Sequence, residues 1–196
     1  METAIIILAA GSSSRMGQPK QLLQYKGQTF LEIAIQAAVQ TSFSPIIVVL
    51  GAHAKKILHV HNHPTITFVI NEDWEKGMSS SIATGMNVIL KDFSDTENVI
   101  ITVADQVHIT STILEDLYHT FKSENKNIVT SHYLQTTGTP ALFNKKYFNN
   151  LLNLQGSGGA KNIIKQHLDD VSSIPFELGH IDIDTATDYH NLINHQ

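Results

Sequence analysis

The chain has 196 residues, of which 42% are apolar and 16% are charged, with a formal net charge of −5 and no cysteine. These values are typical of one globular domain with a substantial core, and they exclude a disulfide framework, a thiolate nucleophile and a Cys-ligated metal. The acidic balance without a basic cluster argues against a nucleic-acid partner, and no apolar run is long enough for a membrane span or a signal peptide. We therefore expect a cytoplasmic protein with a single domain over residues 1–196.

Apolar runs typical of buried strands alternate with helix-like segments along the chain. The predicted strands cover residues 4–8, 46–50, 66–70, 99–103 and 128–130, with further strands near 140–143 and near Ile181. Helices are predicted after the capping-box pattern Thr29–Glu32, over 53–59, from Ser79 or Ser80 to about Leu90, from Thr110 or Thr112, near 145–154 and 160–167, and from about Ala186. This alternation predicts an α/β fold, with a mostly parallel sheet and helices on both faces.

The segment after the first predicted strand, residues 11–20, has the composition of an anion-binding loop. Its small residues leave backbone N–H groups free at the carboxyl end of the strand, and Arg15 and Lys20 add two positive charges. Neither the spacing of a P-loop nor the GxGxxG dinucleotide fingerprint is present. The segment therefore predicts a different loop for the phosphates of a nucleoside triphosphate.

Polar clusters follow three of the predicted strands. They are the loop at 11–20, the segment 71–81 and the residues around Asp105. Ligands of open parallel sheets bind beyond the carboxyl ends of the strands, so we expect these clusters to meet at one edge of the sheet.

With these clusters, the chain resembles the nucleotidyltransferases of the Rossmann-like, GT-A-type fold. It looks most like the molybdenum cofactor cytidylyltransferases and their relatives, the molybdenum cofactor guanylyltransferases. The motifs that carry this resemblance lie at residues 8–20, 71–85, 104–106, 138–140, 156–161 and 182–188. The resemblance implies transfer of a nucleoside monophosphate to the terminal phosphate of a pterin cofactor, with release of pyrophosphate.

The resemblance also implies roles for individual residues. Around the nucleotide it places Leu8, Ala9, Ala10 and Gly11 on the base and ribose, and Gly77, Met78 and Ser81 on the opposite side of the base. Arg15 and Lys20 would hold the triphosphate and act in catalysis. Asp105 would be a catalytic ligand of Mg²⁺, with Asp184 as the second ligand and Asp182 as its competitor. Mg²⁺ accepts only one or two carboxylates, so this pair suffices.

The base and the acceptor follow from finer features. Ala-Ala before the glycine of the first loop goes with cytidylyl transfer in the relatives, so CTP is favoured over GTP. On the side of the phosphorylated pterin we expect Gly138, Pro140 and His108. The chain departs from the family pattern at Val107, where proline is usual, at Ser157, where aspartate is usual, and at Lys161, where arginine is frequent. The last two departures bear on the identity of the acceptor.

Other functions remain open from the sequence. A guanylyltransferase or a sugar-phosphate nucleotidyltransferase would use the same strand-loop geometry. A carrier that holds the finished molybdenum cofactor without catalysis is a further alternative, and in either role an acidic domain could dock transiently on a molybdoenzyme. Retention of Arg15, Lys20 and Asp105 favours the enzyme, because a carrier has no need of a cationic clamp on phosphates.

Several of these residues also have purely structural interpretations. Asp105 could cap a helix, Ser79–Ser81 could do the same, and Asp182 and Asp184 could form a solvated turn before a helix that Thr185 caps. The alternating histidines of 59–63 could bind a metal ion, but Pro64 follows them and no carboxylate supports them, which favours a solvated loop.

Overall fold

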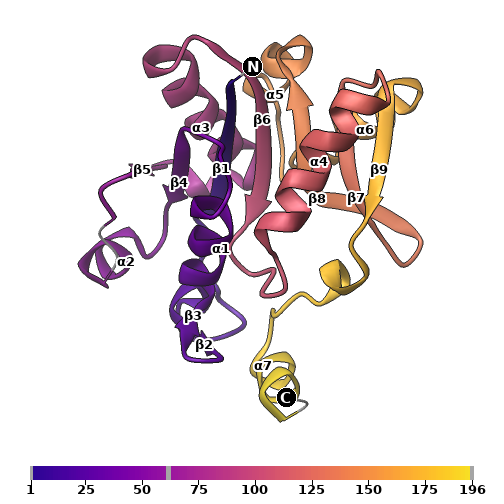
Figure 1. Cartoon of the computed structure of the whole chain (residues 1–196). Coiled ribbons are helices and arrows are strands. Elements are labelled where there is room, and N and C mark those ends of the chain that lie inside the picture. The colour runs from indigo at the N-terminus through magenta and orange to yellow at the C-terminus, as the bar shows by residue number, and fades with distance from the viewer. Residues whose placement is uncertain (1, 61–62, 195–196) are drawn as a thin grey trace.

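The computed structural model describes residues 2–60 and 63–194. A seven-stranded sheet runs through the middle of the molecule in the order β5-β4-β1-β6-β8-β7-β9 (Figure 1). Its strands are β1 (Glu2–Ala9), β4 (Ile46–Leu50), β5 (Ile66–Ile70), β6 (Thr96–Val103), β7 (Ile128–Tyr133), β8 (Thr136–Asn144) and β9 (Val171–Pro175). β1 pairs in parallel with β4 and β6, β4 with β5, and β7 with β9, whereas β8 is antiparallel to both β6 and β7.

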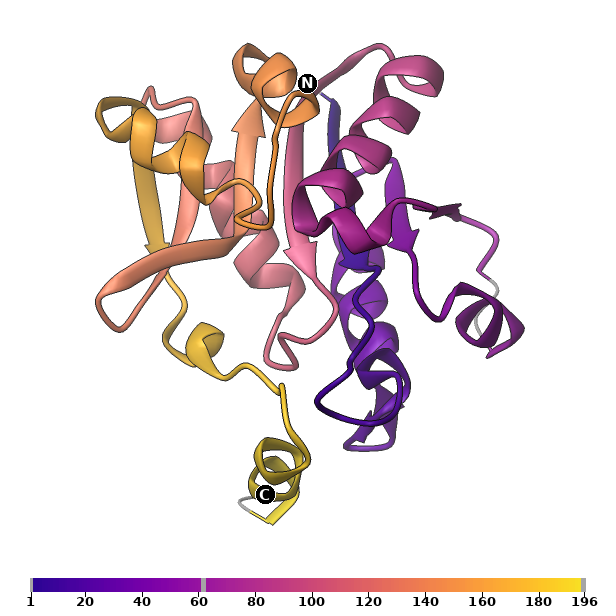
Figure 2. The same ribbon diagram turned by 180° about the vertical axis from the view of Figure 1, so that it is seen from behind.

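Helices cover both faces of the sheet, as Figures 1 and 2 show. The helices are α1 (Phe30–Val39), α2 (Ala54–Val60), α3 (Met78–Asp92), α4 (Ser111–Ser123), α5 (Phe148–Leu152), α6 (Lys161–Gln166) and α7 (Ala186–Asn194). One apolar core lies between the sheet and α1, α2 and α4, and a second lies between the sheet and α3, α5 and α6. Ile5 and Ile7 of β1 belong to the first core and Ile6 to the second, as the two-residue period of a strand requires.

The predicted α/β class, with a mostly parallel sheet and helices on both faces, is therefore confirmed. Two predicted helix starts are confirmed in atomic detail. The Thr29 hydroxyl accepts a hydrogen bond from the Glu32 backbone N–H while Glu32 accepts one from the Thr29 backbone N–H, which completes the capping box. Thr110 likewise caps α4 through the backbone N–H of Ile113.

Two predictions about local structure are wrong. Helix α3 begins at Met78 with Gly77 as its N-cap, so neither Ser79 nor Ser80 caps it. Gly77 has φ 94°, a backbone conformation that a serine would adopt only with strain. No strand forms at Ile181, because the chain has already left the sheet at Pro175 and turns through a 3₁₀ helix, η5 (Glu177–His180). Ile181 packs instead in a small apolar cluster away from the sheet.

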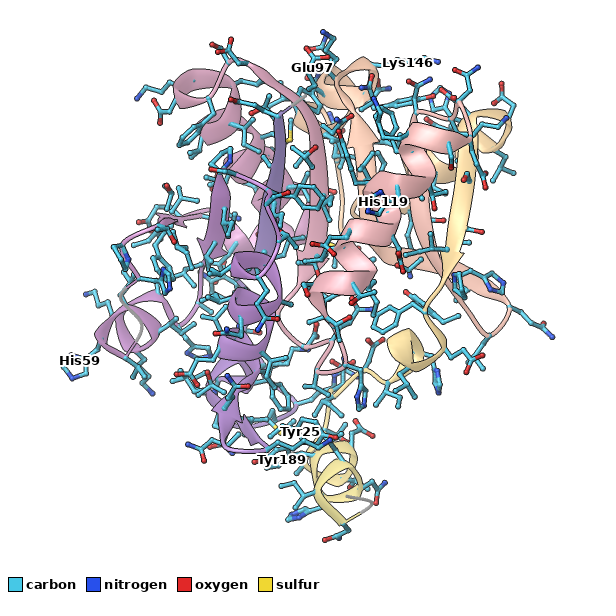
Figure 3. The ribbon with its side chains drawn as sticks, in the orientation of Figure 1. Tyr25, His59, Glu97, His119, Lys146 and Tyr189 are labelled. Carbon is cyan, nitrogen blue, oxygen red and sulfur yellow. The ribbon has the colours of Figure 1, made fainter. Side chains whose placement is uncertain are left out.

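That cluster joins the C-terminal segment to the first third of the chain. A short hairpin, β2 (Gln24–Tyr25) and β3 (Gln28–Thr29), follows the 3₁₀ helix η1 (Lys20–Leu22) and was not apparent in the sequence. Tyr25 and Tyr189 lie next to each other between this hairpin and α7 (Figure 3), and the Tyr189 hydroxyl donates to the carbonyl oxygen of Gln24 at 2.9 Å. The segment that carries Asp182 and Asp184 is thus anchored at both ends.

The remaining features of the fold are the short connecting helices, the histidines at 59–63 and the character of the helices. The connections also contain the 3₁₀ helices η2 (Trp74–Lys76), η3 (Lys145–Tyr147) and η4 (Leu168–Asp170). Of the histidines at 59–63, the middle one lies outside the described residues, so the structure does not address their hypothetical metal site. None of the helices in residues 2–60 and 63–194 has the length and apolar character needed to cross a bilayer.

Close packing at the end of β4 yields a stability prediction. A Cβ atom at Gly51 would lie 2.6 Å from the carbonyl oxygen of Ala10 and 2.7 Å from Cβ of Trp74. Gly51→Ala should therefore lower the free energy of unfolding by about 1–3 kcal/mol, as overpacking does. Gly11→Ala is the matched control, because nothing lies within 4 Å of a Cβ there, and we expect a change within about 0.5 kcal/mol. Equal free energies of unfolding in urea for both variants would contradict this packing argument.

Candidate active site

The loop after β1 is fixed from beneath by its own side chains. Gln21, which is 3% exposed, donates from Nε2 to the carbonyl oxygens of Ala9 at 2.9 Å and of Gly11 at 3.1 Å. The Ser13 hydroxyl accepts from the backbone N–H of Lys20 at 3.0 Å. Gly17 has φ 73°, so the chain can reverse there without strain. These contacts hold the loop open above the carboxyl end of β1.

A cavity of about 440 Å³ lies against this loop, at the carboxyl ends of β1 and β6. Its lining comes from four segments of the chain: Leu8, Ala9, Ala10, Gly11, Ser12, Lys20 and Gln21; Trp74, Glu75, Gly77, Met78 and Ser81; Val103, Ala104 and Asp105; and Ser157. The three polar clusters of the sequence therefore meet at one edge of the sheet. A cavity of this size is within the range of small-molecule sites.

The far wall of this cavity is built on Asn71, which is 3% exposed at the end of β5. Its side-chain amide donates to the hydroxyls of Ser80 at 2.8 Å and Ser81 at 3.0 Å, and its oxygen accepts from the backbone N–H of Asp73 at 3.0 Å. The Ser80 hydroxyl also donates to the carbonyl oxygen of Gly77. The first turn of α3 is thereby held against β5, with Gly77 facing the cavity.

A second cavity of about 280 Å³ adjoins the first and shares Met78, Val103, Asp105 and Ser157 with it. Its walls are largely apolar, and its polar rim consists of Gln106, Tyr133, Thr139, Lys161, Asp182 and Asp184. Because Asp105 lines both cavities, a group bound in one could meet a group bound in the other beside that carboxylate.

Lys20 connects two carboxylates at this junction. Its Nζ atom lies 2.5 Å from Oδ2 of Asp105 and 3.0 Å from Oδ1 of Asp184, and Arg15 lies 2.6 Å from the other oxygen of Asp184. Burial lowers the pKa of Lys20, but the charges and hydrogen bonds of the two carboxylates outweigh this effect and raise its pKa overall. The hydrogen bond from Lys20 lowers the pKa of Asp184. The carboxylate of Asp184 is thus stabilised in the ionised form.

Asp182 lines the second cavity with Asp105 and Asp184, and it forms no ion pair within the described residues. Burial and the negative charges of Asp105 and Asp184 raise the pKa of Asp182, against the weaker attraction of Lys20. Asp105 and Asp184 converge on a single ammonium, so their oxygens surround a point that a small divalent cation could occupy. Two carboxylates with hard oxygen donors fit Mg²⁺, which takes its other ligands from phosphates and water. The described residues hold no group of three or more His, Asp or Glu side chains arranged for a metal ion.

Most of the residues that the sequence places at the nucleotide lie together in the structure. The first cavity is lined by Leu8, Ala9, Ala10, Gly11, Lys20, Gly77, Met78 and Ser81. Arg15 does not line it but pairs with Asp184 of the second cavity, and its side chain is 69% exposed. Asp105 lies at the junction and Asp184 in the second cavity.

The three residues expected on the acceptor side are separated. Gly138 lines the second cavity, at a point where a Cβ would lie 2.2 Å from the Tyr133 hydroxyl oxygen. Pro140 is not part of that lining, and its carbonyl oxygen accepts from the Ser131 hydroxyl. His108 lines a third cavity, of about 390 Å³, with Tyr25 and α7. Burial, together with the positive charges of Lys26 and His180, lowers the pKa of His108.

The sequence analysis assigns no role to two buried glutamines that support the site, Gln21 and Gln106. Both are 3% exposed, and each donates two hydrogen bonds to backbone carbonyls. In the sequence, each of these glutamines directly follows a candidate functional residue, Lys20 or Asp105. This position was the available signal, since glutamine is seldom fully buried without a specific role.

The fold and the site define a nucleotidyltransferase, and comparison with known proteins gives its family. Residues 5–171 match the MobA-like NTP transferase domain. The chain belongs to the family of MobA-like NTP transferase domains, so the resemblance inferred from the motifs is confirmed at the level of the family.

Individual relatives match a smaller part of the chain than the family model does. Nicotine blue oxidoreductase of Paenarthrobacter nicotinovorans is 37% identical over 81 residues, which are 41% of this chain and 40% of that protein. Molybdenum cofactor cytidylyltransferase of Escherichia coli K12 is 32% identical over 114 residues, which are 58% of this chain and 56% of that protein. The matched regions therefore span between two fifths and just over half the length of these two relatives.

The likeness to solved structures extends over nearly the whole chain. Rv0371c from Mycobacterium tuberculosis H37Rv superposes with a TM-score of 0.85 at 25% identity, covering 98% of this chain and 97% of that chain. A structure of Rv0371c in complex with manganese superposes with a TM-score of 0.80 at 24% identity, covering 99% of both chains.

The charges at the site predict that replacing two aspartates by asparagine changes the thermal stability in opposite directions. A raised pKa means that the native protein binds a proton at Asp182 more tightly than the unfolded chain does, so ionisation at neutral pH destabilises the fold. Asp182→Asn should raise Tm at pH 7, by no more than about 2–4 °C because one side of the carboxylate faces solvent. The gain should shrink as the pH falls toward 4.

Asp188→Asn is the control of opposite sign. Hydrogen bonds from Thr185 lower the pKa of Asp188, so its charge contributes stability at neutral pH that is lost in acid. This variant should lower Tm at pH 7. Thermal unfolding of both variants between pH 4 and 7 checks the pair, and a lower Tm for Asp182→Asn at pH 7 would refute the assignment of charge at the site.

Proposed function

We propose that this protein transfers CMP from CTP to the terminal phosphate of a molybdopterin-type molybdenum cofactor, with Mg²⁺ as cofactor and with release of pyrophosphate. One observation carries the proposal: two adjoining cavities share Asp105, and beside it Lys20 pairs with both Asp105 and Asp184 while Arg15 pairs with Asp184. Such an arrangement suits two anionic substrates that must approach each other.

The larger cavity is the proposed nucleotide site. Leu8, Ala9, Ala10 and Gly11 would contact the base and ribose on one side, and Gly77, Met78 and Ser81 would contact the base on the other. The loop after Gly11 would approach the triphosphate with backbone N–H groups. CTP is favoured by the Ala9-Ala10 pair and by similarity to the Escherichia coli protein named as a cytidylyltransferase.

Asp105 and Asp184 are the proposed ligands of Mg²⁺. The ion supplies charge neutralisation of the phosphate oxygens and fixes their geometry. Lys20 now occupies the space between the two carboxylates, so binding of the metal nucleotide would release its ammonium to the α-phosphate or to the leaving pyrophosphate. Arg15, which is largely exposed and pairs with Asp184, would contact the triphosphate from the solvent side.

The proposed reaction is an in-line displacement. An oxygen of the acceptor phosphate forms a bond to the α-phosphorus of CTP while the bond from that phosphorus to the β-phosphate oxygen breaks, and pyrophosphate takes the electron pair. The acceptor phosphate is already an anion at neutral pH and needs no general base. The residues therefore act by positioning and by neutralising charge, which are the main contributions in phosphoryl transfer.

The second cavity is the proposed acceptor site. Its apolar walls suit a planar ring, and Lys161 on its rim could pair with the acceptor phosphate. Ser157, at the position where relatives carry aspartate, lines both cavities and removes one negative charge from the junction. Val107, at the usual proline, is 5% exposed and packs with Met16, Phe30 and Ile183, so buried contacts supply rigidity there. Docking on a receiving molybdoenzyme belongs to the same proposal.

Pyrophosphate release tests the proposal. The protein is assayed with Mg²⁺ and with CTP, GTP, ATP or UTP in turn, in the presence and absence of molybdenum-loaded molybdopterin. We expect release only with CTP and the pterin together. Release with GTP alone among the nucleotides would favour guanylyl transfer, and binding of CTP and cofactor without release would favour the carrier.

The metal assignment is tested in the same assay with Asp105→Asn. Loss of a charged ligand should lower kcat by on the order of 10²–10³, the effect of removing one preorganised charge at other sites. Asp95→Asn is the matched control, because Asp95 is exposed in the turn before β6, at the opposite end of that strand. Wild-type activity in Asp105→Asn would remove Asp105 from the mechanism.

A further inference from the structure

Two glutamines support the site with the same geometry, one under each cavity. Gln21 and Gln106 are each 3% exposed, each donates two hydrogen bonds from Nε2 to backbone carbonyls, and each has an Oε1 atom without a hydrogen-bond partner among the described residues. We propose that Gln106 is a positioning residue that sets the two metal-binding carboxylates, whereas Gln21 positions the triphosphate loop. This inference rests on the proposed function for the role of the metal.

Gln106 joins three segments that are far apart in the sequence. It follows Asp105 directly in the loop after β6, and it donates to the carbonyl oxygen of Thr139 at 2.9 Å and to that of Gly179 at 3.0 Å. Thr139 lies in β8 on the rim of the second cavity, and Gly179 lies in η5, shortly before Asp182 and Asp184. One side-chain amide therefore ties the segment of one proposed ligand to the segment of the other.

The residues around Gly179 are closely packed. A Cβ atom there would lie 2.6 Å from the ring of Phe176 and 2.7 Å from the ring of Tyr133. The carbonyl of Gly179 has little freedom to move, so its hydrogen bond to Gln106 fixes the distance between the two segments. Residues 181–194 beyond it form no strand, so strand pairing does not hold them at this distance.

Gln21 makes the corresponding contacts under the nucleotide cavity. Its amide spans the bend between Ala9 and Gly11, and both of those residues line that cavity. Within the described residues, its side chain forms no hydrogen bond to the segment of Asp184. The two glutamines therefore match in residue type, burial and hydrogen bonding, and differ only in which half of the site they hold.

The chemistry of the amide explains why glutamine stands at both positions. Its NH₂ group carries two donors on one planar nitrogen, which suits two carbonyl oxygens at once, and neither glutamate nor methionine can replace it. Groups that orient metal ligands without touching the metal commonly change its affinity by 10–100-fold when they are removed.

The test compares Gln106→Met with Gln21→Met, since methionine keeps the length of the side chain and removes its donors. Mn²⁺ binding is measured by electron paramagnetic resonance without nucleotide. CTP binding is measured in EDTA by quenching of Trp74, which is the only tryptophan in the sequence and lines the nucleotide cavity. Gln106→Met should raise the Kd for Mn²⁺ about tenfold or more and change the Kd for CTP less than about twofold. Gln21→Met should show the reverse pattern.

A second variant guards against loss of folding. Gln106→Asn retains the amide but is one methylene shorter, so it can reach only one of the two carbonyls, and it should weaken Mn²⁺ binding in the same direction by a smaller factor. Wild-type Mn²⁺ affinity in a folded Gln106 variant, or equal losses of both ligands in both methionine variants, would overturn the inference and leave the proposed function intact. Failure of the wild-type protein to bind Mn²⁺ would instead overturn the metal assignment of the proposed function, and the role of Gln106 with it.

Discussion

One shared ion pair organises the candidate active site: the ammonium of Lys20 lies between the carboxylates of Asp105 and Asp184. Asp105 follows the central strand β6, whereas Asp184 belongs to a segment outside the sheet, and two negative charges this close repel each other unless a cation separates them. Lys20 provides that cation in the structure, and a metal ion would provide it during the proposed reaction. At the neighbouring Asp182, burial and the charges of Asp105 and Asp184 outweigh the attraction of Lys20 and Lys161, so its pKa is raised.

The requirement to hold Asp184 against β6 explains the course of the C-terminal third. After β9 the chain leaves the sheet, turns through η5 and packs α7 against the hairpin β2–β3, so that the last segment crosses the edge where β1 and β6 end (Figure 1). Ile183, which is 1% exposed, packs with Met16 from the nucleotide loop and with Val107 from the loop of Asp105. The loops that carry Lys20, Asp105 and Asp184 therefore share one small apolar cluster.

The central fold could be predicted because its signals are local. Five apolar runs became strands, and the Thr29–Glu32 box and Thr110 began helices where expected. The predictions that failed or were missed depend on tertiary contacts. Ile181 has the character of a strand residue but no neighbouring strand, Gly77 starts α3 through a backbone conformation rather than a side chain, and the partners of Gln21 and Gln106 are backbone carbonyls that no sequence pattern identifies. His108 lines the third cavity beside Tyr25, and its contact with the acceptor stays a prediction.

The central claim is that Lys20 and a divalent metal ion compete for the same two carboxylates. Mn²⁺ titration of the wild-type protein and of Lys20→Gln, followed by electron paramagnetic resonance without nucleotide, tests it most directly. Removal of the ammonium leaves Asp105 without its cation and Asp184 paired with Arg15 alone, so the variant should bind Mn²⁺ more tightly than the wild type, by about tenfold, although it loses a cation proposed for catalysis. Weaker binding of Mn²⁺ by the variant, or binding that is unchanged, would show that the metal does not use this pair of carboxylates.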